Sequence, residues 1–239
     1  MRLIPCALLL LATSAAFAKT ESKDFDAKYV KSFVIENMQG DISITGVTTP
    51  RALVVADEVK FPEDCILDVK QEGTEITAKV DQKSFMRKGD CKVNFTISVP
   101  PNTNLEIKLG SGNLTILNGQ GKIQYKVGNG DVNVDGDIAD IDGKIGSGKT
   151  TVSGLKGKAS FFAGSGTHKI TYAKVPSKGE LEIKTGAGAT DVLLPADSKF
   201  ALDAKIGAGS VHNEIGETKS AKFKITYKAG TGDLNINKN

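Results

Sequence analysis

A phosphate-loop motif is the segment of the sequence that best matches a pattern for nucleotide chemistry. Residues Gly143–Thr150 read Gly-Lys-Ile-Gly-Ser-Gly-Lys-Thr and fit G-x-x-x-x-G-K-[ST]. That chemistry needs a helix directly after the loop, because the helix N-terminus holds the phosphates. The residues that follow, Thr151-Val152-Ser153-Gly154, are rich in β-branched side chains and end in glycine, which predicts a strand. We therefore expect Lys149 to be an exposed residue and the chain to bind no nucleotide.

A calcium-binding repeat has faint counterparts at Gly130-Asp131 and Gly232-Asp233, which are similar to part of the nonapeptide GGxGxDxUx. A column of calcium ions needs oxygen ligands on successive repeats. The equivalent positions of other repeats hold Lys149 and Ala189, which would interrupt such a column. We therefore expect no metal site and no cofactor.

Residues that could carry acid–base catalysis are few. The two histidines, His168 and His212, fall in different repeats, and alternation turns His168 inward, which favours a core role. The acidic residues that stand singly in the later repeats are Glu180, Glu182, Asp191 and Asp203. Two of them could meet across repeats as a glycosidase pair, but the sequence does not select which two. We expect no catalytic residue, and a polysaccharide lyase or hydrolase remains the alternative.

The N-terminal segment, residues 1–18, resembles a secretory signal peptide. Arg2 precedes an apolar run from Leu3 to Leu11, and the segment closes on Ala16-Phe17-Ala18, a small-x-small cleavage pattern. The apolar run is shorter than the about 20 residues that a membrane span requires. The sequence therefore predicts an exported protein without a membrane span, in the periplasm, outside the cell or at the cell surface.

Cleavage of that segment would leave two cysteines, Cys65 and Cys91. An oxidising compartment allows them to pair, so we expect a disulfide between them. The charges are nearly balanced, with 31 Lys and Arg against 28 Asp and Glu. Such a balance gives no general attraction to nucleic acid or to anionic lipid.

An internal repeat dominates the rest of the chain. Glycine pairs of the form Gly-x-Gly begin at residues 110, 128, 146, 164, 186, 207 and 230, and the first three steps are equal in length. We expect these glycines at the corners of the repeats: Gly110, Gly112, Gly128, Gly130, Gly146, Gly148, Gly164, Gly166, Gly186, Gly188, Gly207, Gly209, Gly230 and Gly232.

Apolar residues alternate with polar ones on both sides of each pair, as in Leu105, Ile107 and Leu109, so each repeat predicts two short strands. One such unit cannot bury its apolar face alone, but units stacked in parallel share a continuous interior. The fixed step predicts a parallel β-helix, or β-solenoid, over residues 105–239. An antiparallel sandwich is the runner-up, but it has no reason to repeat one corner at a fixed step.

The N-terminal third is less regular. Residues 19–30 are charged and predict a flexible tail, and residues 31–104 predict an irregular β cap that holds the cysteine pair. The cap and the regular repeats would form one domain. At the other end, the polar residues Asn235, Asn237 and Asn239 would close the stack.

Outward positions of the second strand form a predicted column of small, polar and mostly uncharged side chains. Its members are Thr115, Asn133, Thr151, Lys169, Asp191, His212 and Asn235. A flat ladder of this kind is a candidate binding face for carbohydrate or for an envelope or surface protein.

The segment Phe33–Ile44 and the transition from Val99 to Leu114 resemble the bacterial putative-adhesin family of unknown function. In that family a glycine-aspartate strand opens the domain, and a proline-led strand precedes Gly-x-Gly repeats. The resemblance implies a β-helical envelope or surface protein with an adhesive role, and it transfers no catalytic or binding residue. The expected function is therefore that of an exported, non-enzymatic, adhesin-like binding or structural module.

Overall fold

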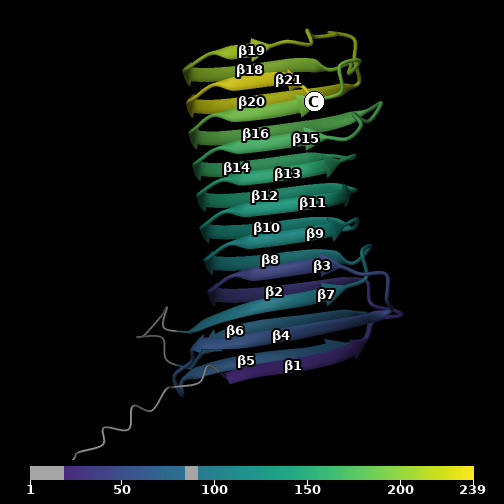
Figure 1. Ribbon diagram of the computed structural model, residues 1–239. Helices are drawn as coiled ribbons and strands as arrows, with labels where there is room; N and C mark the ends of the chain where they lie inside the picture. The colour runs from purple at the N-terminus through teal and green to yellow at the C-terminus, as the bar shows by residue number, and fades with distance from the viewer. Residues whose placement is uncertain (1–18, 84–90) are drawn as a thin grey trace, which may run out of the picture.

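The computed structural model describes residues 19–83 and 91–239, so the predicted signal segment lies outside the described residues. Within these ranges the chain folds into 21 β-strands. None of the described residues belongs to a helix long and apolar enough to cross a membrane. The strands stack into a tall column of coils, with two ladders of strands that face each other across the core (Figure 1).

Ladder A contains the longer strands. In spatial order these are β5 (Cys65–Glu72), β6 (Glu75–Gln82), β2 (Ser32–Gln39), β8 (Asn104–Ser111), β10 (Lys122–Asn129), β12 (Asp140–Ser147), β14 (Ala159–Ser165), β16 (Gly179–Ala187), β20 (Phe223–Thr231) and β18 (Ala201–Ala208).

Ladder B completes each coil. Its spatial order is β1 (Lys19–Asp26), β4 (Arg51–Lys60), β7 (Lys92–Val99), β3 (Ile42–Gly46), β9 (Leu114–Gly119), β11 (Val132–Ile138), β13 (Thr150–Leu155), β15 (His168–Tyr172), β17 (Thr190–Leu194), β21 (Leu234–Lys238) and β19 (Val211–Asn213).

The regular coils are parallel and in register. Lys126 pairs with Lys108 on one side and with Lys144 on the other, so equivalent positions of successive repeats stand side by side. The predicted all-β solenoid is therefore confirmed. Among the described strands, antiparallel pairing is confined to the N-terminal end, where β1 pairs with β4, β4 with β7, and β5 with β6.

The core forms because inward positions of both ladders are apolar. In β8 the side chains of Leu105, Ile107 and Leu109 are buried, and the outward residues between them are exposed. Rings from opposite ladders meet inside, since Phe161 of β14 lies 6.1 Å from His168 of β15, measured between ring centroids. The two ladders therefore share one continuous interior, as the alternation requires.

The glycine pairs lie at the corner between the two ladders. At Gly130 the backbone has φ 137°, a conformation that favours glycine. A Cβ there would lie 2.0 Å from the carbonyl oxygen of Gly112 in the preceding coil. Close stacking of the backbones at this corner therefore excludes any side chain.

Side-chain oxygens tie the coils together beside the same corner. The backbone N–H of Asn113 donates to Asp41 Oδ1 at 2.8 Å, that of Asp131 to Asn113 Oδ1 at 3.0 Å, and that of Lys149 to Asp131 Oδ1 at 2.9 Å. Each Asp or Asn thus satisfies a backbone donor one coil further along, which the bend leaves without a ladder partner.

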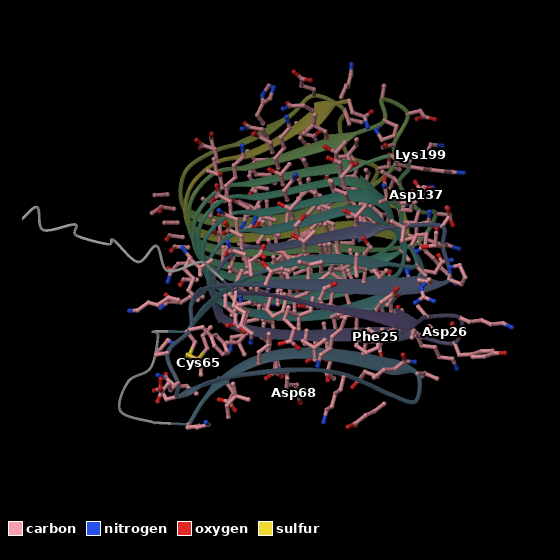
Figure 2. The ribbon with its side chains drawn as sticks, turned by 60° about the horizontal axis from the view of Figure 1, so that its bottom comes forward. Phe25, Asp26, Cys65, Asp68, Asp137 and Lys199 are labelled. Atoms are coloured by element: carbon pink, nitrogen blue, oxygen red, sulfur yellow. A yellow bond between two sulfur atoms is a disulfide. The ribbon has the colours of Figure 1, made fainter. Side chains whose placement is uncertain are left out.

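The prediction of a flexible tail at residues 19–30 is wrong. Residues Lys19–Asp26 form β1, which pairs antiparallel with β4. Arg51 Nη2 lies 2.7 Å from Asp24 Oδ2, and Phe25 packs partly buried against the core (Figure 2). The charges that indicated a tail are those of an edge strand, because charged side chains protect an unpaired edge.

The order of the coils also differs from the expected order. β2 and β3 form a full coil between β6–β7 and β8–β9, with Gly40 at its corner, and the cap begins only beyond it. At the other end the last coil of the chain, β20–β21, is inserted between β16–β17 and β18–β19 (Figure 1).

The polar C-terminal residues therefore do not close the stack. The size of the inward side chains accounts for the exchange, because Tyr227 of β20 stands where β18 has Ala204, so β20 has more apolar surface to bury. The more apolar coil occupies the interior position, where both of its neighbours cover it.

The predicted disulfide is present. Cys65 and Cys91 are bonded at 1.97 Å, with 5.8 Å between their Cα atoms. The bond joins the start of β5 in ladder A to the residue before β7 in ladder B, at the antiparallel end of the stack (Figure 2). It therefore links the two ladders of the cap covalently.

Candidate functional site

The structure brings the predicted binding column together on the outer surface of ladder B. Strand register aligns its seven members in the order Thr115, Asn133, Thr151, Lys169, Asp191, Asn235 and His212. Asn235 precedes His212 because the C-terminal coil is inserted. Asn235 Nδ2 donates to Asp191 Oδ1 at 2.9 Å, so two members also bond to each other.

The outer surface of ladder A carries a column whose charges alternate. Its members in spatial order are Lys122, Asp140, Lys158 (the residue before β14), Glu180 and Lys224. Opposite charges on adjacent strands attract and like charges repel. The positive charges of the lysines in this column are therefore largely offset by the acidic residues between them.

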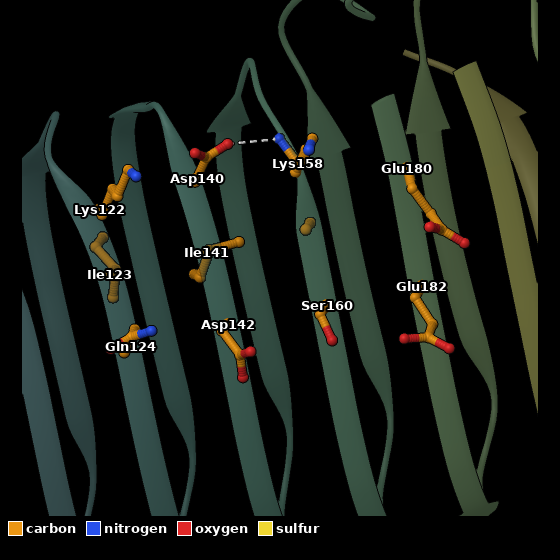
Figure 3. Close-up of a pocket in the computed structure, with 11 residues that line it drawn as sticks. Lys122, Ile123, Gln124, Asp140, Ile141, Asp142, Lys158, Ser160, Glu180 and Glu182 are labelled. Atoms are coloured by element: carbon orange, nitrogen blue, oxygen red, sulfur yellow. Dashed lines mark hydrogen bonds between the residues drawn. The ribbon is translucent and has the colours of Figure 1, made fainter. Parts of the chain in front are cut away.

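A shallow depression lies over β10, β12, β14 and β16, where Asp140, Asp142, Glu180 and Glu182 project from the outer face (Figure 3). Three of these carboxylates have partners in the surface. Asp140 accepts the Lys158 backbone N–H at 2.8 Å, Glu180 accepts the Thr226 hydroxyl at 2.9 Å, and Glu182 lies 2.5 Å from Lys184 Nζ.

The acids Asp140 and Asp142 stand on β12, and Glu180 and Glu182 stand on β16, with β14 between the two strands. The two strands are therefore two strand spacings apart, or about 9.6 Å. This is at the upper limit of the separation that inverting glycosidases use. The hypothesis of a polysaccharide lyase or hydrolase requires acids from different repeats to meet, and this depression is where such acids lie together.

A second column on ladder A consists mostly of lysines, and we call it the lysine column. Its members are Lys108, Lys126, Lys144, Lys184, Lys228 and Lys205, with Phe162 between Lys144 and Lys184. The alternation of apolar and polar residues predicts that these positions face outward, but it does not by itself single out a column of lysines. The signal that would have found the column is a lysine two residues before the first glycine of almost every pair.

Acidic neighbours compensate the lysine column only in part. Lys108 Nζ lies 3.0 Å from Glu36 Oε1, and this ion pair lowers the pKa of Glu36 and raises that of Lys108. Lys184 pairs with Glu182 of its own strand. Among the residues that the structure describes, Lys126 and Lys144 form no ion pair.

The two histidines lie in opposite environments. His168 is 2% exposed and faces inward between Thr150 and Thr190 of the neighbouring coils. Within residues 19–83 and 91–239, neither of its ring nitrogens has a hydrogen-bond partner. Burial lowers its pKa from 6.5 to about 4. His168 is therefore a neutral core residue, whereas His212 is exposed on the outer surface.

The segment that matches the phosphate loop is part of the solenoid. β12 runs through Gly143, whose position lies beneath the ring of Tyr125, and strand β13 occupies the place of the required helix. Lys149 is exposed at the corner. The chain therefore folds these residues as two strands and a corner, without the helix N-terminus that would hold a phosphate.

The aspartates that were compared with a calcium repeat bond to backbone instead. The hydroxyl and the backbone N–H of Ser210 both donate to Asp233 Oδ1 at 2.8 Å, and these two bonds lower the pKa of Asp233. Asp131 accepts the Lys149 N–H in the same way. The described ranges contain no group of three or more His, Cys, Asp or Glu side chains placed to hold a metal ion.

Comparisons with known proteins give similar solved structures, whereas no family model and no curated protein matches the sequence. A "putative cell adhesion protein" from Clostridium sporogenes is 13% identical, with 93% of this chain and 100% of that chain covered and a TM-score of 0.41. A "putative adhesin" from Parabacteroides distasonis is 14% identical over 91% of this chain and 97% of that chain, with a TM-score of 0.42.

A "putative lipid binding protein" from Parabacteroides distasonis is 13% identical over 92% of this chain and 96% of that chain, with a TM-score of 0.30. Structures named as adhesins are thus among those to which this chain is similar.

Proposed function

We propose that this protein is a non-enzymatic binding module of the bacterial envelope or cell surface, which presents its flat outer faces to a carbohydrate or to an envelope protein. The observation that carries the proposal is the register of the coils. Because equivalent positions stand side by side, each outer face carries straight columns of side chains, one from each coil, at a strand spacing of about 4.8 Å. Such a surface matches a ligand that is itself repetitive.

The column on ladder B is the face that we assign to this partner. Most of its side chains are hydroxyls and amides, which both donate and accept hydrogen bonds as sugar hydroxyls do. Asn133 is exposed, and Thr115 and Thr151 on either side of it are half-buried and therefore held in place. The names of similar structures as adhesins agree with this role.

The disulfide supports an extracytoplasmic location. Disulfides persist in oxidising compartments and are rare in the cytosol. The Cys65–Cys91 bond is formed at the cap, and Cys91 is fully buried. The disulfide and the signal-like N-terminus both support our proposal that the protein acts in the periplasm, outside the cell or at its surface.

Binding of the purified protein to an array of neutral and charged glycans and to envelope proteins tests the proposal. The variant Asn133→Lys with Thr151→Lys obstructs the ladder B column, and Gln124→Lys with Ser160→Lys is the matched control on ladder A. We expect the first variant to lose binding and the control to retain it. Equal loss in both variants, or no ligand for the wild type, would contradict the proposal.

A polysaccharide-acting enzyme is the second candidate, because the depression over β12 and β16 gathers four carboxylates (Figure 3). The bonds of Asp140, Glu180 and Glu182 to neighbouring groups favour a structural role for these acids. A hydrolase and lyase screen distinguishes the two candidates. Turnover that Asp142→Asn or Glu182→Gln abolishes would establish the enzyme in place of the binding module.

A further inference from the structure

The lysine column lies on the outer surface of ladder A, away from the face assigned above. It spans β8, β10, β12, β16, β20 and β18, and β14 contributes Phe162 in the same line. Its existence is not explained by folding, because like charges directly opposite each other on adjacent strands destabilise a sheet.

The alternating column, which lies on the same strands, differs from the lysine column in its charge. There Lys122 of β10, Asp140 of β12 and Lys158, the residue before β14, alternate in charge. Further along the same strands, Lys126 and Lys144 stand directly opposite each other with no acid between them. The same surface thus has one column in which charge is balanced and one in which positive charge accumulates.

A strip without side chains borders the lysine column. The next outward position in each strand is the first glycine of its pair, so the backbone itself forms the surface. One shallow depression is lined by Lys79, Lys108 and Lys126 together with Gly110 and Gly128, and the acids Glu36 and Asp81 lie at its end. Another is lined by Lys184, Lys205 and Lys228 together with Gly186 and Gly230. A polymer can therefore lie on the glycines with the ammonium groups along one edge.

Phe162 adds an aromatic surface to the same line. Its side chain is 37% exposed, and Lys184 Nζ lies 4.7 Å from the centre of its ring. The exposed part of this ring offers apolar surface to the C–H groups of a sugar, and the lysines of the column offer charge beside it. Burial does not explain this ring, because its position faces outward.

We infer that the lysine column and the adjoining glycine strip bind an extended anionic polysaccharide that carries a carboxylate on each successive sugar. The inference rests on the proposed binding function and names the ligand class of a second face. The lysines recur in one line at a strand spacing of about 4.8 Å. An extended chain with closely spaced carboxylates can therefore meet several ammonium groups at once.

Nucleic acid fits the column less well. Proteins that bind single strands without sequence preference stack successive bases on several aromatic side chains, and the lysine column has the single ring of Phe162. Phosphate groups are best held by the bidentate guanidinium of arginine, which the column lacks. Lysines act as point charges, which suits isolated carboxylates.

The test compares polygalacturonate, hyaluronan, dextran and single-stranded DNA as ligands of the purified protein. The variant Lys126→Gln, Lys144→Gln, Lys228→Gln removes three charges from the lysine column. The control Lys122→Gln, Lys158→Gln, Lys224→Gln removes three charges from the alternating column of the same face. All six positions are exposed, so both variants are expected to fold.

We expect polygalacturonate to bind more tightly than hyaluronan, which has a carboxylate on every second sugar, and dextran not to bind this face. The lysine-column variant should weaken polygalacturonate binding about tenfold or more, and the control less than about threefold. Raising the salt from about 0.01 M to about 1 M, which shortens the Debye length from ~30 Å to ~3 Å, should abolish binding.

Equal losses in the two variants would overturn the inference, and so would failure of polygalacturonate to bind or tighter binding of DNA than of polygalacturonate. Dextran or another neutral glycan that binds and is lost only in the Asn133→Lys, Thr151→Lys variant would leave the proposed function standing. If the ladder B variant loses all binding and the lysine-column variant loses none, the proposed function also stands and the inference about the lysine column is overturned.

Discussion

The burial of His168 makes a specific prediction about acid stability. Its imidazole is 2% exposed between the two ladders, and burial lowers its pKa from 6.5 to about 4. In the unfolded chain the ring takes up a proton below about pH 6.5, whereas the folded protein keeps it neutral until about pH 4. The unfolded state therefore binds more protons across this interval, and stability falls as the pH is lowered through it.

The size of the effect follows from the shift in pKa. Each unit corresponds to about 1.4 kcal/mol, so the free energy of unfolding should decrease by about 3 kcal/mol between neutral pH and pH 4, and His168 should contribute no further decrease below that. This is a large fraction of the about 5–15 kcal/mol that stabilises a typical domain.

Urea unfolding of the wild type and of His168→Leu over this pH range measures the contribution. Leucine occupies the equivalent inward position in other coils, at Leu114 and Leu234. The wild-type value minus the variant value should fall by about 3 kcal/mol from pH 7 to pH 4, because carboxylates common to both proteins cancel.

The variant His212→Gln, which removes the exposed histidine, is the matched control and should keep the pH dependence of the wild type. If His168→Leu also keeps that dependence, the ring is not buried as a neutral group, and this account of the core is wrong.

Three further outcomes are expected. Replacing Cys65 and Cys91 by alanine should lower the free energy of unfolding by about 3.5 kcal/mol, the loop entropy for a separation of 26 residues, as measured by denaturant titration. Gly130→Ala should cost more than about 3 kcal/mol because of its clash with the preceding coil, whereas Gly73→Ala, with no atom within 4 Å, should cost about 1–2 kcal/mol. Amide hydrogen exchange should be faster in β18–β19 than in β20–β21, because only the latter coil is covered on both sides; equal rates would contradict the observed coil order.

The solenoid was predictable because its determinants are local and repeated. Alternation in Leu105–Leu109 fixes which side chains face inward, and the glycine pair fixes where the chain turns. The constant step between the first glycine pairs then fixes the register, since Lys126 can align with Lys108 and Lys144 only when the coils are stacked in parallel.

The order of the coils was not predictable from the same signals. The coils β18–β19 and β20–β21 both have a glycine pair and the same alternation, so exchanging them preserves every local pattern. The difference lies in how much apolar surface each coil buries, with Tyr227 in one and Ala204 in the equivalent place of the other. That comparison requires knowledge of which neighbours each coil has.

Edge strand β1 was not predicted from the sequence, for a different reason. Its sequence, Lys-Thr-Glu-Ser-Lys-Asp-Phe-Asp, contains one large apolar side chain, and composition alone indicates a loose tail. Its order depends on partners that lie far along the chain, since Thr20 bonds to Asp57 and Asp24 to Arg51. Long-range pairing of polar side chains leaves no periodic signal in the strand itself.

The coil order also determines how far each surface column extends. Insertion of β20–β21 places Lys228 between Lys184 and Lys205, and Asn235 between Asp191 and His212. Because each coil in a stacked array is stabilised by its nearest neighbours, the end coil frays first and the inserted coil stays ordered. Both columns therefore keep their members up to β20 and β21 even when β18 and β19 open. A ligand that lies along the stack can contact Lys205 or His212 only while β18 and β19 are folded. Binding of such a ligand should therefore stabilise the end coil.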